Sequence, residues 1–180
     1  RGRIAAPFFV FCIRHYSRMS IAQQIRRLWP LVVLALLPIL VFRSGLGGGF
    51  IFDDEPNLLR DWSWRITSIS PRDLLQAASG GMAGLGGRPL AMLSFGLNHV
   101  VTGDAAHALK LTNLAFHVLN AWLVYALLVR LHALAVPGAR RSYAPLFVAA
   151  AWAIHPLQVS TVLYVVQRME LGAATGILLS

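Results

Sequence analysis

Three acidic residues, Asp53, Asp54 and Glu55, stand side by side directly after the first long apolar run of the sequence. The chain has only seven Asp and Glu residues, so this cluster holds much of its negative charge. A positioned carboxylate can accept the proton of an attacking hydroxyl group. Neighbouring carboxylates can instead hold a divalent cation through their oxygen atoms. The cluster predicts general-base chemistry or a metal site, and both alternatives stay open at this point.

The cluster also fits a purely structural role as the solvated start of a loop, with Asp53 capping a short helix. Chemistry at a phosphate-bearing leaving group would further need a cation to stabilise the departing charge. Arg88 and Arg168 both lie at the predicted outer face with the cluster and could supply this cation. For Arg168, an anchor at the membrane interface is the competing interpretation.

Polar residues at helical spacing provide further candidates. Asn113, His117 and Asn120 are separated by four and three positions, so they share one face of an apolar helix. Polar groups at membrane depth are costly and normally face protein or water. Hydrogen bonding between helices is the interpretation we favour, and lining of a substrate cavity is the alternative. His155 precedes Pro156, and a helix-end role competes there with substrate binding.

The composition places these residues in a membrane protein. The sequence is 57% hydrophobic and 13% charged, whereas a soluble domain carries about 25% charged residues. The net charge of +9 rests almost entirely on Arg, in clusters beside apolar runs, as the positive-inside rule expects. We therefore expect the lipid bilayer as a partner and no nucleic acid. Cys12 is the only cysteine, which excludes an internal disulfide.

Apolar runs and charges together predict an all-α, polytopic bundle of membrane helices with a helical first external loop. A basic cytoplasmic arm covers residues 1–27. Within it we expect Met19 to be the true start, and a surface arm over residues 1–18 is the alternative. The predicted segments that follow are a first membrane helix (28–43), an external loop with the acidic cluster and interfacial helices (44–108), a second membrane helix (109–131), a cytoplasmic loop (132–142), a third membrane helix (143–156), and an external turn with a truncated fourth membrane helix (157–180).

The segment 89–101 decides which side of the membrane each loop occupies. Its helix would span about 20 Å, which is short of the roughly 30 Å hydrocarbon core. If it crossed, the basic residues Arg130, Arg140 and Arg141 would lie outside, against the positive-inside rule. We therefore place it along the outer membrane surface, which puts the acidic cluster opposite the cell interior.

Two shorter patterns concern the external loop. Trp62 and Trp64 are typical of the membrane–water interface and predict anchors there. The run from Ser70 to Asp73 combines an N-cap Ser, a Pro at the first helical position and an acid in the first turn. It predicts a short helix that runs to the glycines at positions 80 and 81.

Several short motifs occur in an order that is typical of one family. They are Phe52-Asp53-Asp54-Glu55-Pro56-Asn57-Leu58, then Arg88-Pro89-Leu90 with Leu93-Ser94-Phe95 and Leu97-Asn98, then Leu111-Thr112-Asn113 with His117 and Asn120, and finally His155-Pro156-Leu157-Gln158 with Gln167-Arg168-Met169-Glu170-Leu171. Over about residues 25–180 the chain resembles the N-terminal membrane part of GT-C type glycosyltransferases. The nearest branch is the transmembrane proteins with C-terminal tetratricopeptide repeats, relatives of the protein O-mannosyltransferases.

The resemblance implies a multi-pass enzyme of the bacterial inner membrane, with its N-terminus in the cytoplasm. Such an enzyme transfers a sugar from a polyprenyl-phosphate-linked donor to a protein or other hydroxyl acceptor on the non-cytoplasmic face. The resemblance implies a catalytic role for Asp53 and Asp54. The candidate substrate-binding residues are Glu55, Arg88, Arg168, His155, Asn113 and His117. The family's remaining helices and repeats lie outside these residues, so this stretch alone should be an inactive fragment.

Two other functions fit the composition. The chain could be a non-enzymatic multi-pass anchor or scaffold for a downstream interaction domain, with the polar stripe on residues 113, 117 and 120 joining helices. A transporter would need broken helices and charges at mid-bilayer. Arg168 and Glu170 are the only indication of a transporter.

Overall fold

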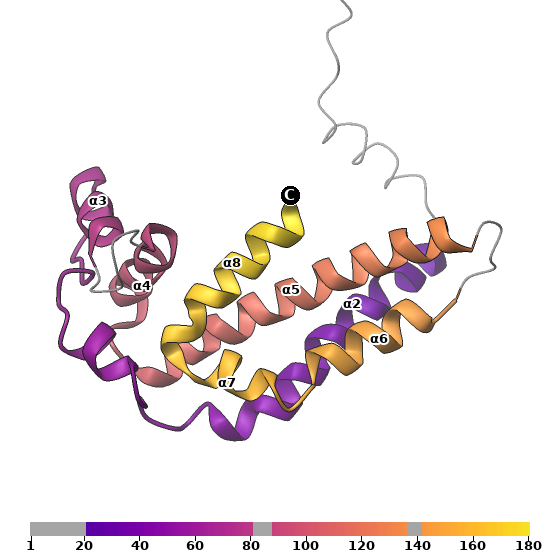
Figure 1. The fold of residues 1–180 in the computed structure, drawn as a ribbon, viewed down its shortest axis with the longest axis horizontal. Helices are drawn as coiled ribbons and strands as arrows, with labels where there is room; N and C mark the ends of the chain where they lie inside the picture. Colours follow the sequence, from indigo (N-terminus) through magenta and orange to yellow (C-terminus); the bar gives the residue numbers. More distant parts are fainter. Residues whose placement is uncertain (1–20, 81–87, 137–141) are drawn as a thin grey trace, which may run out of the picture.

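The computed structural model describes residues 21–80, 88–136 and 142–180, with side chains from residue 28 onward in these ranges. Within them every regular element is helical (Figure 1), so the prediction of an all-α fold is confirmed. The predictions for residues 1–20, including the start at Met19, lie outside these ranges. The elements are α2 (Ile21–Phe42), η1 (Arg43–Gly45), η2 (Glu55–Leu59), α3 (Pro71–Ser79), α4 (Pro89–Thr102), α5 (Ala106–Ala135), α6 (Ala144–Ala153), α7 (Gln158–Leu163), η3 (Val165–Gln167) and α8 (Arg168–Leu179).

Two helices of the described chain are long and apolar enough to cross a membrane. One apolar stretch, Leu28–Gly45, covers most of α2 and η1, and the other is α5. The 30 residues of α5 would extend about 45 Å, more than the roughly 30 Å hydrocarbon core. The apolar helix α6 has ten residues and would reach only about 15 Å. By length and composition, α2 and α5 indicate membrane association.

The long helix α5 is the centre of the molecule, because α2, α6 and α8 all pack against it (Figure 1). Leu34 of α2 packs with Leu146 and Ala149 of α6. At the C-terminal end of α2, Phe42 packs with Leu114 of α5. These contacts hold α2, α5 and α6 side by side as one bundle.

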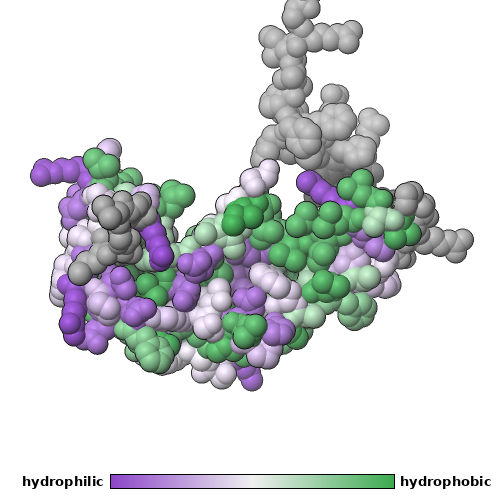
Figure 2. Space-filling model, viewed as in Figure 1, coloured by the Kyte–Doolittle hydropathy of each residue, from purple (hydrophilic) through white to green (hydrophobic). Residues whose placement is uncertain are grey.

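The outward faces of this bundle are apolar. Figure 2 shows hydrophobic side chains along the half formed by α2, α5 and α6, whereas hydrophilic ones gather near η2, α3 and α4. Leu134 and Phe147 are 78% and 72% exposed. Large exposed apolar patches mark contact with a membrane or a partner, so this half of the molecule suits a lipid environment.

The acidic cluster lies at one end of the bundle. There α2 ends, α5 begins and α6 ends, and η2, α3 and α4 lie beside them (Figure 1). The end of α5 and the start of α6 lie at the opposite end. Because α2 and α6 end on the same side of the bundle, residues 50–60 lie close to the segment that connects α6 to α8.

The helix α3 begins and ends where the sequence predicts. The Ser70 hydroxyl accepts the Asp73 N–H at 3.1 Å, and Gly80 is the C-cap. A hydrogen bond of 2.6 Å from the Ser68 hydroxyl holds the pKa of the Asp73 carboxyl below its usual value. Local capping chemistry is sufficient to define this element.

The helix α4 packs closely on α3 through Gly96. A Cβ at this position would lie 2.8 Å from the Ala77 Cβ and 3.0 Å from the Trp64 carbonyl oxygen. Trp64 itself is 1% exposed, and its Nε1–H donates to the Leu58 carbonyl at 3.2 Å. The prediction that Trp64 anchors the interface is therefore wrong, because the indole fills the core beneath α4. Trp62 is 70% exposed.

Candidate functional site

The neighbouring carboxylates of Asp53 and Asp54 lie in different environments. Asp54 is fully buried, and its Oδ2 and Oδ1 atoms accept the N–H groups of Ile51 at 3.1 Å and Val166 at 2.8 Å. Asp53 is exposed. Only Asp53 of this pair can reach a ligand that arrives from outside.

The third carboxylate, Glu55, is also exposed and forms a surface ion pair with Arg60 at 2.8 Å. Within the described residues no group of three or more His, Cys, Asp and Glu side chains could hold a metal ion. Because both oxygens of Asp54 accept backbone N–H groups and Glu55 pairs with Arg60, the three carboxylates do not converge on one point. We therefore assign no metal-dependent step to this cluster.

Burial raises the pKa of the Asp54 carboxyl above its ordinary value, and the hydrogen bonds from Ile51 and Val166 oppose this rise. A smaller opposing effect comes from the positive charge of Lys110. Lys110 is 3% exposed, and its Nζ donates to the Gly48 carbonyl at 2.9 Å. No sequence motif includes Lys110, although the single lysine of the sequence at the start of an apolar helix is a usable signal.

Tyr164 is a second residue that the sequence does not single out. Its hydroxyl oxygen accepts the Asp53 N–H at 2.7 Å, and its ring meets that of Phe52 edge-on at 6.3 Å between centroids. Phe52 has a φ of 46° and is 83% exposed. Bulky residues adopt this left-handed conformation only at a cost. The turn at Phe52 is thus held by the hydrogen bonds of the two residues that follow it, Asp53 and Asp54.

Arg168 is 1% exposed. Its Nε, Nη1 and Nη2 atoms donate to Asn113 Oδ1 at 2.9 Å, the Ser94 carbonyl at 3.2 Å and the Leu109 carbonyl at 2.8 Å. The guanidinium also lies 4.2 Å from the centroid of the Phe95 ring. Among the described residues no carboxylate pairs with it. Arg168 therefore joins α4, α5 and α8 and keeps an unneutralised positive charge, instead of acting as an interfacial anchor.

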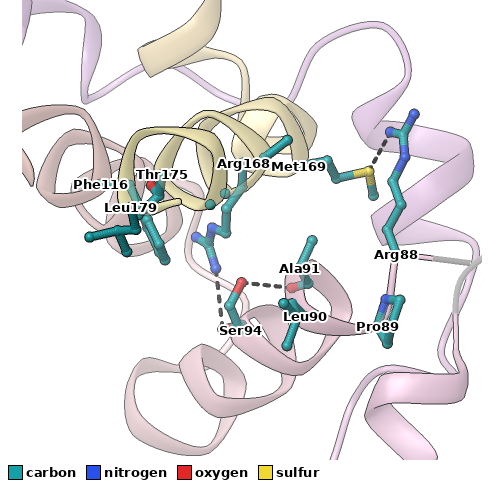
Figure 3. Close-up of a pocket in the computed structure, with 13 residues that line it drawn as sticks. Arg88, Pro89, Leu90, Ala91, Ser94, Phe116, Arg168, Met169, Thr175 and Leu179 are labelled. Carbon is teal, nitrogen blue, oxygen red and sulfur yellow. Dashed lines mark hydrogen bonds between the residues drawn. The ribbon is translucent and has the colours of Figure 1, made fainter. Parts of the chain in front are cut away.

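A cleft of about 570 Å³ lies between α4 and α8 (Figure 3). Arg88 and Arg168 both line it, and no acidic residue of the described ranges does. Arg88 is exposed, and its Nη1 donates to Met169 Sδ at 2.7 Å. Much of the remaining wall is apolar or small, including Leu90 and Gly176. Apolar walls with one exposed and one buried positive charge fit a ligand that is both apolar and anionic.

The other candidate residues lie outside this cleft. Asn113 and Asn120 each donate from the side-chain amide to a backbone carbonyl of the C-terminal segments at 3.1 Å. His117 Nε2 lies 2.8 Å from the Ala153 carbonyl oxygen. These contacts match the interpretation of the stripe as hydrogen bonding between helices. His155 is exposed, and its Nδ1 accepts the N–H two residues further on at 3.2 Å, as at a helix end.

The acidic cluster and the arginine-lined cleft are separate parts of the predicted site, since none of the three carboxylates lines the cleft. The short segment 164–168 connects them, because Tyr164 and Val166 contact the cluster and Arg168 lines the cleft. No family model, curated protein or solved structure matches this chain.

Proposed function

We propose that this chain is the membrane part of a glycosyltransferase that uses a polyprenyl-phosphate-linked sugar as donor. The observation that carries the proposal is the cleft between α4 and α8, which the described residues line with apolar side chains and two arginines but no acid. A lipid phosphate has the matching division into an apolar chain and an anionic head. Guanidinium groups bind phosphate through charge-assisted hydrogen bonds and stabilise the charge that develops on a phosphate leaving group.

Asp53 supplies the second function that transfer needs. The acceptor hydroxyl gives its proton to the exposed Asp53 carboxylate while its oxygen forms a bond to the anomeric carbon of the sugar. The bond from that carbon to the phosphate oxygen breaks, and the electron pair stays on the phosphate. The exposed Arg88 binds this phosphate in the cleft, and the buried charge of Arg168 adds positive potential behind it. The proton and the leaving group therefore go to different groups of the site.

The proposal extends to the placement of the chain in the membrane. The apolar helices α2 and α5 support membrane association. We place the end that carries the acidic cluster on the non-cytoplasmic side of a bacterial inner membrane, with further helices completing a multi-pass bundle. Support comes from the sequence, because residues 1–27 and 130–141 carry basic residues and no acidic ones, as the positive-inside rule expects of cytoplasmic segments.

The direct test is binding of a polyprenyl phosphate to the full-length protein in lipid nanodiscs. Arg88→Ala should weaken binding by about tenfold, because a charge-assisted contact is lost. Arg72→Ala is the matched control, since Arg72 is exposed on α3 and does not line the cleft. Equal affinity of the wild type and Arg88→Ala would contradict the proposal.

A non-enzymatic membrane scaffold is the second candidate function. The observation that favours it is the use of Asn113, His117 and Asn120 for hydrogen bonds between helices. Such bonds suit a rigid anchor. A scaffold would show no turnover of any polyprenyl-phosphate sugar, whereas a transferase would release polyprenyl phosphate in the presence of an acceptor.

A further inference from the structure

Two hydrogen bonds tie the acidic cluster to a segment far away in the sequence that leads into Arg168 at the cleft. The Asp53 N–H donates to the Tyr164 hydroxyl at 2.7 Å, and Asp54 Oδ1 accepts the Val166 N–H at 2.8 Å. Arg168, two residues after Val166, is fixed by its three acceptors on α4 and α5. The position of Asp53 relative to the cleft thus depends on the segment 164–168.

We propose that Asp54 and Tyr164 are positioning residues that hold the Asp53 backbone at a fixed place relative to the Arg168 guanidinium. The inference rests on the proposed function, because it assigns separate roles within that same site. Asp53 is then the catalytic carboxylate, and Asp54 acts through the backbone of the segment 164–168.

The environment of Asp54 excludes direct proton transfer from an acceptor in this conformation. A general base must come within about 2.6–3.2 Å of the hydroxyl that it deprotonates. Asp54 is 0% exposed, and each of its carboxylate oxygens already accepts a backbone N–H. A buried carboxylate with two backbone donors is typical of a residue that fixes a loop.

Lys110 provides a third tie between the same loop and the bundle. Its buried Nζ holds the Gly48 carbonyl to α5 at 2.9 Å, and its charge favours the ionised form of Asp54. The loop from Gly48 to Asp54 is therefore fixed at both ends by buried charged side chains. A loop held in this way can keep Phe52 in its left-handed conformation and present Asp53 outward.

The test combines hydrogen exchange with kinetics on the full-length protein. In Asp54→Asn, one acceptor oxygen becomes an NH₂ group that faces a backbone N–H, so a hydrogen bond is lost. The amides of residues 51–54 and 164–168 should then exchange about tenfold faster. Tyr164→Phe should accelerate exchange at Asp53 alone. Asp73→Asn and Tyr143→Phe, outside both parts of the site, are the matched controls.

Kinetics then separate positioning from catalysis. Asp53→Asn should lower kcat by about 10²–10⁴-fold and remove the acidic limb of the pH profile, without faster exchange. Asp54→Asn should lower kcat less and keep that limb. The inference is overturned if Asp54→Asn leaves amide exchange unchanged. It is also overturned if Asp54→Asn loses the acidic limb of the pH profile while Asp53→Asn keeps it. Absence of transfer by the wild type refutes the proposed function instead, and the exchange data still decide whether the ties exist.

Discussion

At the scale of single residues, burial distinguishes side chains of the same type that lie one or two positions apart in the sequence. Asp53 is exposed and Asp54 is 0% exposed; Trp62 is 70% exposed and Trp64 is 1% exposed. The sequence locates the acidic cluster but assigns both aspartates the same role. The difference comes from Val166 and Tyr164, which lie 112 and 111 positions from their partners. A contact between residues so far apart in the chain leaves no pattern in the local sequence around either of them.

The buried carboxylate predicts a pH dependence of stability. Burial raises the pKa of Asp54 in the folded state, so the folded state binds this proton more tightly than the unfolded state. The stabilising contribution is complete below the ordinary value of 3.8 and is lost as the pH rises through the raised value. The measurement is the thermal-unfolding midpoint of the wild type minus the midpoint of Asp54→Asn. This difference should therefore fall as the pH rises from 3.8 and then level off.

The same comparison with Asp73→Asn serves as a control, because hydrogen bonding lowers the pKa of Asp73. Its contribution has the opposite sign and grows as the pH rises toward the ordinary value of 3.8. A difference for Asp54 that grows with pH in the same way would show that the folded state prefers the charged form.

At the scale of elements, local chemistry predicts some boundaries and misses others. Capping residues define α3, whose start at Pro71 follows directly from Ser70. The stretch after Pro156 is harder, because it divides into α7, η3 and α8. The division places Arg168 at the start of α8, where carbonyl groups of α4 and α5 accept its N–H groups. The apolar periodicity of the sequence does not reveal these hydrogen-bond acceptors, because they lie far from Arg168 in the chain.

The contact between α3 and α4 predicts a specific sensitivity at Gly96. A methyl group there would meet Ala77 and the backbone of Trp64 at 2.8 and 3.0 Å. Gly96→Ala should lower the free energy of unfolding by about 1–3 kcal/mol, because overpacking displaces one helix from the other. Gly47→Ala is the control, since a Cβ there meets nothing within 4 Å. Equal chemical-denaturation midpoints for the two variants would refute this close packing.

At the scale of the whole molecule, composition predicts the all-α class, and the long apolar helices α2 and α5 agree with it. The cleft is not predictable in the same way, since it forms between α4 and α8, which are far apart in the sequence. The sequence identifies Arg88 and Arg168 singly, and only the fold shows that they share one cleft, to which the part of the chain that the structure describes contributes no acid. Membrane placement then decides whether this cleft and Asp53 can act together on the non-cytoplasmic side.

Labelling with a membrane-impermeant thiol reagent tests this central claim most directly, in full-length protein with Cys12 replaced by Ser. Arg60→Cys reports on the acidic cluster, since the Arg60 side chain is 73% exposed. Ser142→Cys reports on the opposite end, where α6 begins. The account predicts that intact cells label Arg60→Cys and that Ser142→Cys reacts only after the membrane is opened. Labelling of both positions from the same side would contradict it.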